Sequence, residues 1–251
     1  MSLQKIKTLS IITATTCFIH TALANTSQHN LSPIWAGSYI GADLAAGFAT
    51  TGYTAAQRFG STGPFDKFAF ATFTQDSQGV IGGIEAGHDW QRHRWVLGVE
   101  TRFDGSDLST TTSNEFDATS PVVFNANVQT KTNYSWLYTL TPRVGFACHN
   151  FLFFGKTGLG ITHAKMDIDA PTAGNAQASS FSQTQNLLGW DIGGGMEYAL
   201  HQWRLGVEYD YINFGSNDFG GKGTAEGTDT ANSLSTSLNI IALTAGYHFN
   251  A

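Results

Sequence analysis

The sequence predicts an all-β protein: an eight-stranded up-and-down antiparallel transmembrane β-barrel with four long extracellular loops and three short periplasmic turns. Three observations favour this fold. Apolar residues alternate with polar or small ones in eight segments of roughly 10 residues, the period of a β-strand. Charged residues are only 13% of the chain, although it contains 28 glycines, and a typical soluble domain carries about 25% charged residues. The connections between the segments are alternately long and short.

The N-terminal residues have the pattern of a secretory signal peptide. Lys5 and Lys7 precede a short apolar run at 9–19, and Ala22-Leu23-Ala24 resembles a cleavage site. We therefore expect residues 1–24 to be a signal peptide and residues 25–251 to form the barrel. The apolar run is too short for a membrane-spanning helix. Cleavage would remove two lysines and no acid, so the formal charge of −6 would become −8, which argues against a nucleic-acid partner.

The first four segments each separate an apolar face from a polar or glycine-rich face. They are, in chain order, WAGSYIGADLAAGF (35–48), GVIGGIEAGHDW (79–90), WVLGVETRFD (95–104) and SWLYTLTPRVGF (135–146). Each is long enough for a tilted transmembrane strand, which needs about 9–11 residues.

The last four segments repeat the pattern. They are FLFFGKTGLGIT (151–162), LGWDIGGGMEY (188–198), WRLGVEYDY (203–211) and IIALTAGYHF (240–249). No helical periodicity competes with the alternation in any of the eight segments.

The connections fix the expected topology. The second and third, fourth and fifth, and sixth and seventh segments are joined by a few polar residues. The remaining connections, 49–79, 105–131, 165–186 and 214–237, are rich in Ser, Thr, Asn and Gly. Long and short connections therefore lie at opposite ends of the barrel, as in outer-membrane barrels.

The polar face identifies the lumen. It is mostly Gly, Thr and Ser, which suits the narrow interior of an eight-stranded barrel, and its charges have both signs and can pair in a closed interior. A water-soluble, lipocalin-like barrel with the apolar face inward is the alternative. The predicted lumen charge network is Glu85, Glu100, Arg102, Arg143, Lys156, Asp191, Glu197, Arg204, Glu208 and Asp210.

Aromatic residues flank the short turns and predict a girdle at one membrane interface. Its predicted members are Trp90, Trp95, Tyr198, Trp203, Tyr247 and Phe249.

The segments WAGSYIGADLAAG, GVIGGIEAGHDWQ…WVLGVETRFDGSDL and GWDIGGGMEYAL…WRLGVEYDYINFG together resemble the small eight-stranded outer-membrane barrels of Gram-negative bacteria. They are most similar to the porin-like outer-membrane β-barrel group and the OmpA-type transmembrane domain. The resemblance implies export by the Sec signal peptide to the outer membrane. It also implies contact with outer-membrane lipid and lipopolysaccharide, and assembly by periplasmic chaperones and the barrel-assembly machinery.

We expect a non-enzymatic protein with an envelope or surface structural role, whose loops are available for adhesion or contact with a host-cell surface. The alternative is a small, low-conductance porin-like channel. Phe65, Phe68, Phe70 and Phe73 are candidate surface-loop residues for adhesion, or else they pack together on a strand that extends above the membrane.

The histidines offer two further possibilities, a metal site and a catalytic site. The turn histidines His93, His149 and His201 would be metal ligands only if they converged, and ordinary polar turns explain them better. His88 and His163 lie in no recognisable nucleophile motif for lipid processing. We therefore predict no catalytic residue, no metal and no cofactor.

Overall fold

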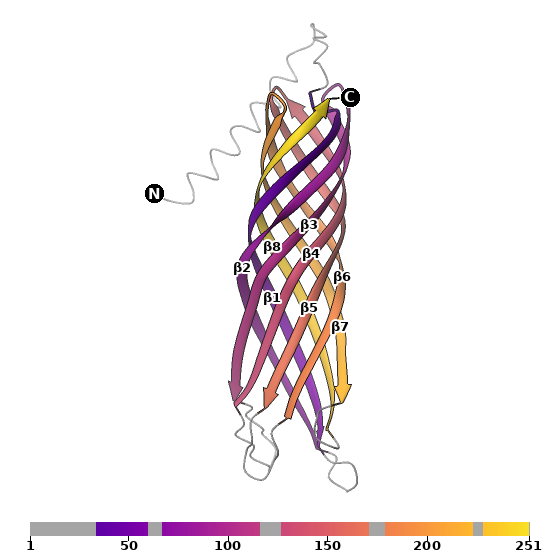
Figure 1. The fold of residues 1–251 in the computed structure, drawn as a ribbon. Helices are drawn as coiled ribbons and strands as arrows, with labels where there is room; N and C mark the ends of the chain where they lie inside the picture. Colours follow the sequence, from indigo (N-terminus) through magenta and orange to yellow (C-terminus); the bar gives the residue numbers. More distant parts are fainter. Residues whose placement is uncertain (1–33, 60–66, 116–126, 171–178, 223–227, 251) are drawn as a thin grey trace, which may run out of the picture.

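A computed structural model of the chain describes residues 34–59, 67–115, 127–170, 179–222 and 228–250. Within them, eight antiparallel strands form one closed barrel, in which each strand pairs with its neighbours in sequence and β1 pairs with β8 (Figure 1). The predicted fold class is confirmed. The strands are β1 (Gly37–Phe59), β2 (Lys67–Arg92), β3 (Trp95–Glu115), β4 (Asn127–Cys148), β5 (Phe151–Ala170), β6 (Ser179–Leu200), β7 (Trp203–Lys222) and β8 (Thr228–Asn250).

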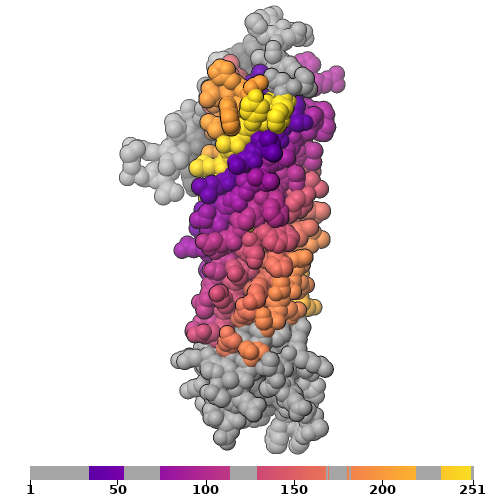
Figure 2. Space-filling model, viewed as in Figure 1, coloured from indigo at the N-terminus to yellow at the C-terminus, as the bar shows by residue number. Residues whose placement is uncertain are grey.

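Closure of the sheet is visible at the seam between β1 and β8, which lie side by side on the surface of an elongated cylinder (Figure 2). Leu44 of β1 pairs with Gly82 of β2 on one side and with Leu243 of β8 on the other. A closed sheet leaves no unpaired strand edge, and the hydrocarbon core of a bilayer does not tolerate such an edge. No helix in the described part of the chain is long and apolar enough to cross a membrane.

Three two-residue turns close one end of the barrel, here called the turn end. Each begins with a histidine in the left-handed region of backbone conformation, with φ of 58° at His93, 54° at His149 and 58° at His201. Tight hairpins favour positive φ because it matches the twist of the flanking strands. The three histidines therefore occupy the same position in three equivalent turns.

The strands are much longer than the sequence predicts. They contain 20–26 residues each, and they continue through most of the four stretches expected to be loops. Every described residue of these four stretches belongs to a strand, so the prediction that they are loops is wrong for those residues. The clear alternation is lost there because the outward face is polar and the inward face mixes polar residues such as Gln75 with apolar ones such as Met166. The backbone still pairs across each strand, and threonine suits an extended chain. We call this end of the barrel the loop end.

β-Bulges lie at the level where the outer surface of the barrel changes from apolar to polar. The part of the barrel between this level and the loop end is here called the polar extension. Register shifts occur between Gly105 and Leu108 in β3, Tyr134 and Leu137 in β4, and Asn213 and Ser216 in β7. A bulge adds one residue to one strand and increases its local twist. In β4 the bulge changes which positions face the lumen. Along the chain these are even-numbered residues such as Thr130 and Tyr134 before the bulge, and odd-numbered residues such as Leu137 and Thr139 after it.

The outer surface between the turns and the bulges is apolar. Side chains such as Leu44, Ile84, Leu97, Leu188 and Leu243 are 59–62% exposed. The stretch 203–211 holds nine residues between two aromatic ends, Trp203 and Tyr211, close to the length that a tilted membrane strand needs. This surface therefore faces lipid, which excludes the soluble-barrel alternative.

The lumen is filled by side chains in layers. Near the turn end lies an apolar floor of six buried residues: Trp35, Val96, Ala147, Leu152, Phe154 and Ala199. Above it comes a charged layer, and above that a second apolar layer that includes Ile81, Leu108, Leu137, Leu187 and Ile212, each at most 2% exposed. The charged residues are thus enclosed by apolar side chains on both sides.

Candidate functional site in the barrel lumen

The charged layer contains all ten residues of the predicted lumen network. Each is 5% exposed or less. They come from six strands: Glu85 on β2, Glu100 and Arg102 on β3, Arg143 on β4, Lys156 on β5, Asp191 and Glu197 on β6, and Arg204, Glu208 and Asp210 on β7.

Arg143 organises the part of the layer nearest the turn end. Its Nε donates to Asp89 Oδ1 at 2.9 Å, and its Nη2 donates to Asp89 Oδ2 at 2.5 Å. Its Nη1 donates to Glu197 Oε1 at 2.7 Å and to Glu100 Oε2 at 3.2 Å. One guanidinium group therefore joins carboxylates from three strands, using the planar, forked geometry that distinguishes arginine from lysine.

Arg204 supports the same carboxylates from β7. It donates to Glu197 Oε2 at 2.9 Å through Nε, and to Asp89 Oδ2 at 3.0 Å through Nη1. Tyr39 contributes its ring to both arginines, with its centroid 3.9 Å from the Arg204 guanidinium carbon and 5.0 Å from that of Arg143. Cation–π contacts of this kind become stronger when the groups are removed from water.

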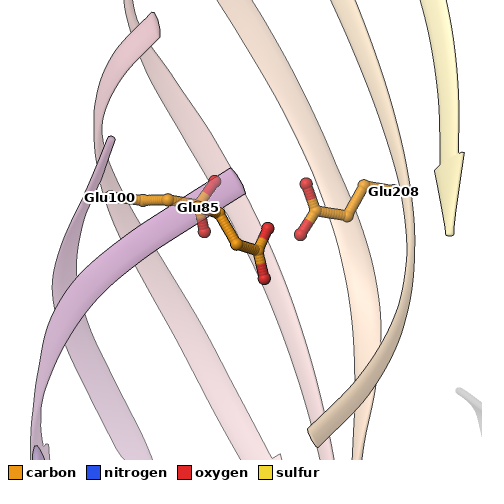
Figure 3. A group of neighbouring side chains, drawn as sticks. All are labelled: Glu85, Glu100 and Glu208. Carbon is orange, nitrogen blue, oxygen red and sulfur yellow. The ribbon is translucent and has the colours of Figure 1, made fainter. Parts of the chain in front are cut away.

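Lys156 and Arg102 organise the middle of the layer. Lys156 Nζ donates to Glu208 Oε2 at 2.7 Å and to Glu100 Oε1 at 3.1 Å. Arg102 Nη2 lies 2.5 Å from Glu208 Oε2, 3.4 Å from Glu85 Oε2 and 3.6 Å from Glu100 Oε1. Three glutamates from β2, β3 and β7 consequently point toward one another across the lumen (Figure 3).

The glutamate trio has the spacing of a metal site but already has basic partners. One oxygen from each of Glu85, Glu100 and Glu208 lies within 4.8 Å of the others. Because Lys156 bridges two of these carboxylates and Arg102 contacts all three, a metal ion there would have to displace a base. The arrangement is explained by the bridging bases.

The structure corrects the expectation that all ten residues pair. Asp191 is buried in the lumen, but neither of its carboxylate oxygens has a hydrogen-bond partner. Asp89, which holds two arginines, was absent from the predicted network, as were the buried carboxyl groups of Asp43 and Asp104. Strand parity places all three on the polar face, and that signal was sufficient to find them.

The apolar lumen layers also lie outside the prediction, because the lumen face was identified by its polar side chains. Leu152 and Phe154 share the parity of Lys156, and Ile212 shares that of Asp210. Their apolar character hides them in a search for polar lumen residues.

The six predicted girdle residues lie on the outer surface beside the turn end. Trp95 packs edge-on against Phe146 with ring centroids 5.6 Å apart, and Trp203 packs against Tyr247 at 5.5 Å. Tyr198 lies against Phe151 at 4.9 Å, and Tyr247 against Phe249 at 5.3 Å. Trp90 is 58% exposed and contacts His88.

A second group of outward aromatic residues, not predicted as a girdle, lies at the level of the bulges. Trp136 stacks between Phe103 and His163 at 5.9 Å from each, and Trp190 packs edge-on against Tyr211 at 5.5 Å. Two aromatic levels separated by an apolar surface are typical of membrane barrels, in which they mark the two interfaces.

The remaining candidate residues lie in the turns, in β2 or outside the described residues. The backbone of Phe68, Phe70 and Phe73 belongs to β2 and not to a loop, because the strand pairing with β1 continues to Lys67. Phe65 lies outside the described residues. Among the described residues, the glutamate trio is the one group of three or more potential metal ligands, so the turn histidines do not converge.

The two histidines outside the turns have polar partners. His88 Nδ1 lies 2.9 Å from Ser38 Oγ, and His163 Nδ1 lies 2.7 Å from Asn186 Oδ1. A serine–histidine catalytic site requires a third, orienting acid on the other ring nitrogen. None of the contacts described for His88 supplies one.

A closed barrel with a lipid-facing apolar surface, two aromatic levels and a charged, side-chain-filled lumen defines a transmembrane β-barrel protein. A family model described as "Outer membrane protein beta-barrel domain" matches residues 11–249. The chain therefore belongs to this family and is an outer-membrane protein of Gram-negative type.

Named relatives agree with this assignment. The chain is 27% identical over 198 residues to the 31 kDa outer-membrane immunogenic protein of Brucella melitensis, with 73% of each chain covered. It is 26% identical over 163 residues to the 22 kDa outer membrane protein of Rhizobium leguminosarum bv. viciae, with 64% of each covered. Among solved structures, OprG from Pseudomonas aeruginosa is 12% identical with a TM-score of 0.48, over 86% of this chain and 97% of that chain.

Proposed function

We propose that this protein is a non-conducting, non-enzymatic barrel that anchors a long column of paired strands at the cell surface, where it serves envelope structure and surface contact. The observation that carries the proposal is the filled lumen, in which a charged layer lies between two apolar layers. The porin-like channel is the alternative that this observation disfavours.

The lumen layers oppose ion flow in two ways. An eight-stranded barrel is only wide enough for side chains to fill it, and here Arg143, Arg204 and Lys156 each bridge carboxylates across it. Opening a path would separate buried ion pairs, at a cost of about 3–5 kcal/mol for each broken pair. The apolar layers add a second barrier, because hydrophobic constrictions exclude water and ions.

The polar extension at the loop end supports the surface role. Above the second aromatic level the outward side chains of neighbouring strands become hydrophilic; on β3 to β6 they include Thr111, Lys131, Lys165, Ser180 and Ser182. Such a surface suits water and lipopolysaccharide sugars. We place the loop end outside the cell, and the turn end in the periplasm, where chaperones and the barrel-assembly machinery act during biogenesis.

The names of the relatives support the surface role. The Brucella relatives are named as immunogenic proteins, and surface display would explain such a property in a protein of this architecture. Adhesion to a host-cell surface is the contact that we propose for the loop end.

Conductance separates the anchor from the channel. Purified protein is inserted into planar bilayers beside the variants Glu100→Gln and Arg102→Met. We expect the wild-type protein to give no steady openings. Steady openings in the wild-type protein, shifted in size by either substitution, would establish the channel and refute the anchor.

Lysine labelling tests the orientation within the same chain. Lys131 and Lys165 are exposed on the loop-end surface, whereas Lys156 is buried in the lumen. A membrane-impermeant amine reagent applied to intact cells should modify the first two and leave Lys156 unmodified. Labelling of Lys131 and Lys165 only after the cells are permeabilised would contradict the orientation.

A further inference from the structure

The turn between β2 and β3, here called the basic turn (residues 91–95), differs from the other two turns in its charge. It contains Arg92 and Arg94, whereas the turns at 148–150 and 200–202 contain no arginine or lysine. Arg92 is exposed and Arg94 is half-buried. In the described part of the chain, neither arginine forms an ion pair. Two positive charges at the turn end are therefore not neutralised by an acid of the described protein.

The outer surface near the basic turn offers these arginines no acid. In the part of the barrel between the turns and the bulges, every described carboxyl side chain is buried in the lumen. The four bases of the charged layer are buried there as well. Arg92 and Arg94 consequently give the lipid-facing side of the turn end a positive charge, although the whole chain has a formal charge of −6. A positive surface of this kind favours an anionic partner.

Strand pairing places Arg92 beside the aromatic girdle. Arg92 pairs in register with Trp95, and Trp90 pairs with Leu97. Alternate residues of a strand lie on the same face, so Arg92 lies on the outer face together with Trp90, two residues nearer the end of the barrel. Trp90, Trp95 and Leu97 are 58–61% exposed. Tryptophan marks the membrane interface, so the guanidinium group of Arg92 lies at the level of the lipid headgroups.

The same side chains surround a hollow on the outer surface of the barrel. Its volume is about 470 Å³, and its lining consists of Trp90, Gln91, Arg92, His93, Trp95 and Leu97. The polar residues of this lining belong to the turn, whereas Leu97 lies on the side of the hydrocarbon. The lining therefore changes from polar to apolar toward the middle of the membrane, in the same order as the headgroup and the acyl chains of a phospholipid.

From this arrangement we infer that the basic turn is a binding site for an anionic phospholipid of the periplasmic leaflet, whose phosphate is held by Arg92 and Arg94. Guanidinium groups bind phosphate through a fork of N–H donors, and basic residues beside a membrane attract anionic lipids. Two bases without an acid favour an anionic headgroup over a zwitterionic one. The choice of leaflet rests on the proposed orientation of the barrel, and the lipid site itself goes beyond the proposed anchor function.

Lipid binding by the purified barrel tests the site. Protein in detergent micelles is titrated with phosphatidylglycerol, phosphatidylcholine or lipid A, and the bound lipid is counted by native mass spectrometry. The test variant is Arg92→Gln/Arg94→Gln. The matched control is Lys131→Gln/Lys165→Gln, which removes the same number of charges from the exposed surface of the loop end. A third variant, Arg92→Lys/Arg94→Lys, keeps the positive charge of the basic turn.

We expect wild-type protein and the lysine control to prefer phosphatidylglycerol over phosphatidylcholine. This preference should fall by roughly ten- to thirtyfold in Arg92→Gln/Arg94→Gln, since each base beside an anionic surface contributes about fivefold, and Arg92→Lys/Arg94→Lys should keep most of it. If the double glutamine variant does not fold, Arg92→Gln alone should lose about fivefold.

The absence of a preference in wild-type protein, or an equal loss in the lysine control, would overturn the inference. Binding of lipid A, and not of phosphatidylglycerol, that depends on the two arginines would make lipopolysaccharide the occupant and overturn the assignment to the periplasmic leaflet. Binding in detergent does not depend on the orientation in the cell, so this experiment and the lysine labelling of intact cells can fail separately.

Discussion

Replacing Arg143 by alanine would remove the group that joins the largest number of strands at the turn end of the lumen. Arg143 is 3% exposed and donates four hydrogen bonds to three carboxylates, those of Asp89, Glu100 and Glu197. Its guanidinium also lies 5.0 Å from the ring centres of Tyr39 and Phe154. The substitution therefore removes a charge, several hydrogen bonds and packing volume together.

The remaining bases limit the loss. Arg204 still contacts Asp89 at 3.0 Å and Glu197 at 2.9 Å, and Lys156 still contacts Glu100 at 3.1 Å. No carboxylate is left entirely alone, so we expect the cost of a single broken buried pair, about 3–5 kcal/mol. This corresponds to a change of roughly two to four orders of magnitude in the unfolding equilibrium, since 1.4 kcal/mol is about tenfold.

Urea unfolding in detergent micelles, followed by tryptophan fluorescence, measures this free energy. The matched control is Lys165→Ala, because Lys165 pairs with Asp167 at 2.9 Å on the outer surface with 47% of its side chain exposed. Exposed pairs are worth about 0.2–1 kcal/mol. An Arg143→Ala variant that is destabilised no more than this control would refute the view that the network holds the barrel together. Addition of Asp89→Ala should cost less than the sum of the two single changes, because the residues are in direct contact.

Two further predictions concern packing in the lumen. Gly98→Ala should destabilise the barrel by about 1–3 kcal/mol, because the added Cβ would collide with Asp89 Oδ1. Gly52→Ala should be tolerated, because the atom nearest to its added Cβ would be 3.9 Å away. Equal unfolding midpoints for the two variants would contradict this prediction. Leu187→Ala should lower the free energy of unfolding by about 2–5 kcal/mol, because Leu187 is fully buried. The same substitution at its neighbour Leu188, which is 60% exposed to lipid or detergent, should lower it clearly less. A larger effect at Leu188 would mean that the two faces of β6 have been exchanged.

Period-two alternation was sufficient to predict the number of strands, their order and the face of each lumen charge. A shift of one residue would move all the apolar side chains of a strand from the lipid to the lumen. The pattern in segments such as 203–211 therefore allows only one assignment of its two faces. The short polar connections likewise predicted the end at which the tight turns lie.

Strand length could not be predicted at the loop end. In β6, Ser180, Ser182 and Thr184 face outward into water, so neither face of this part of the strand needs to be apolar. The sequence of this part of the strand therefore has the same polar character as that of a loop. Backbone pairing with β5, which continues to Ala170↔Ser179, decides the structure.

The sequence by itself determined the fold class, the membrane-facing surface and the face of each of the ten predicted lumen charges, because each depends only on the alternation along a single strand. Only the tertiary structure decided which charges meet. Arg143 reaches Asp89 and Glu197, each 54 residues away, while the carboxylate oxygens of Asp191, on the same face as Glu197, have no hydrogen-bond partner. The level and the direction from which each side chain enters the lumen depend on strand tilt and stagger around the closed barrel, and no local pattern in the sequence records them.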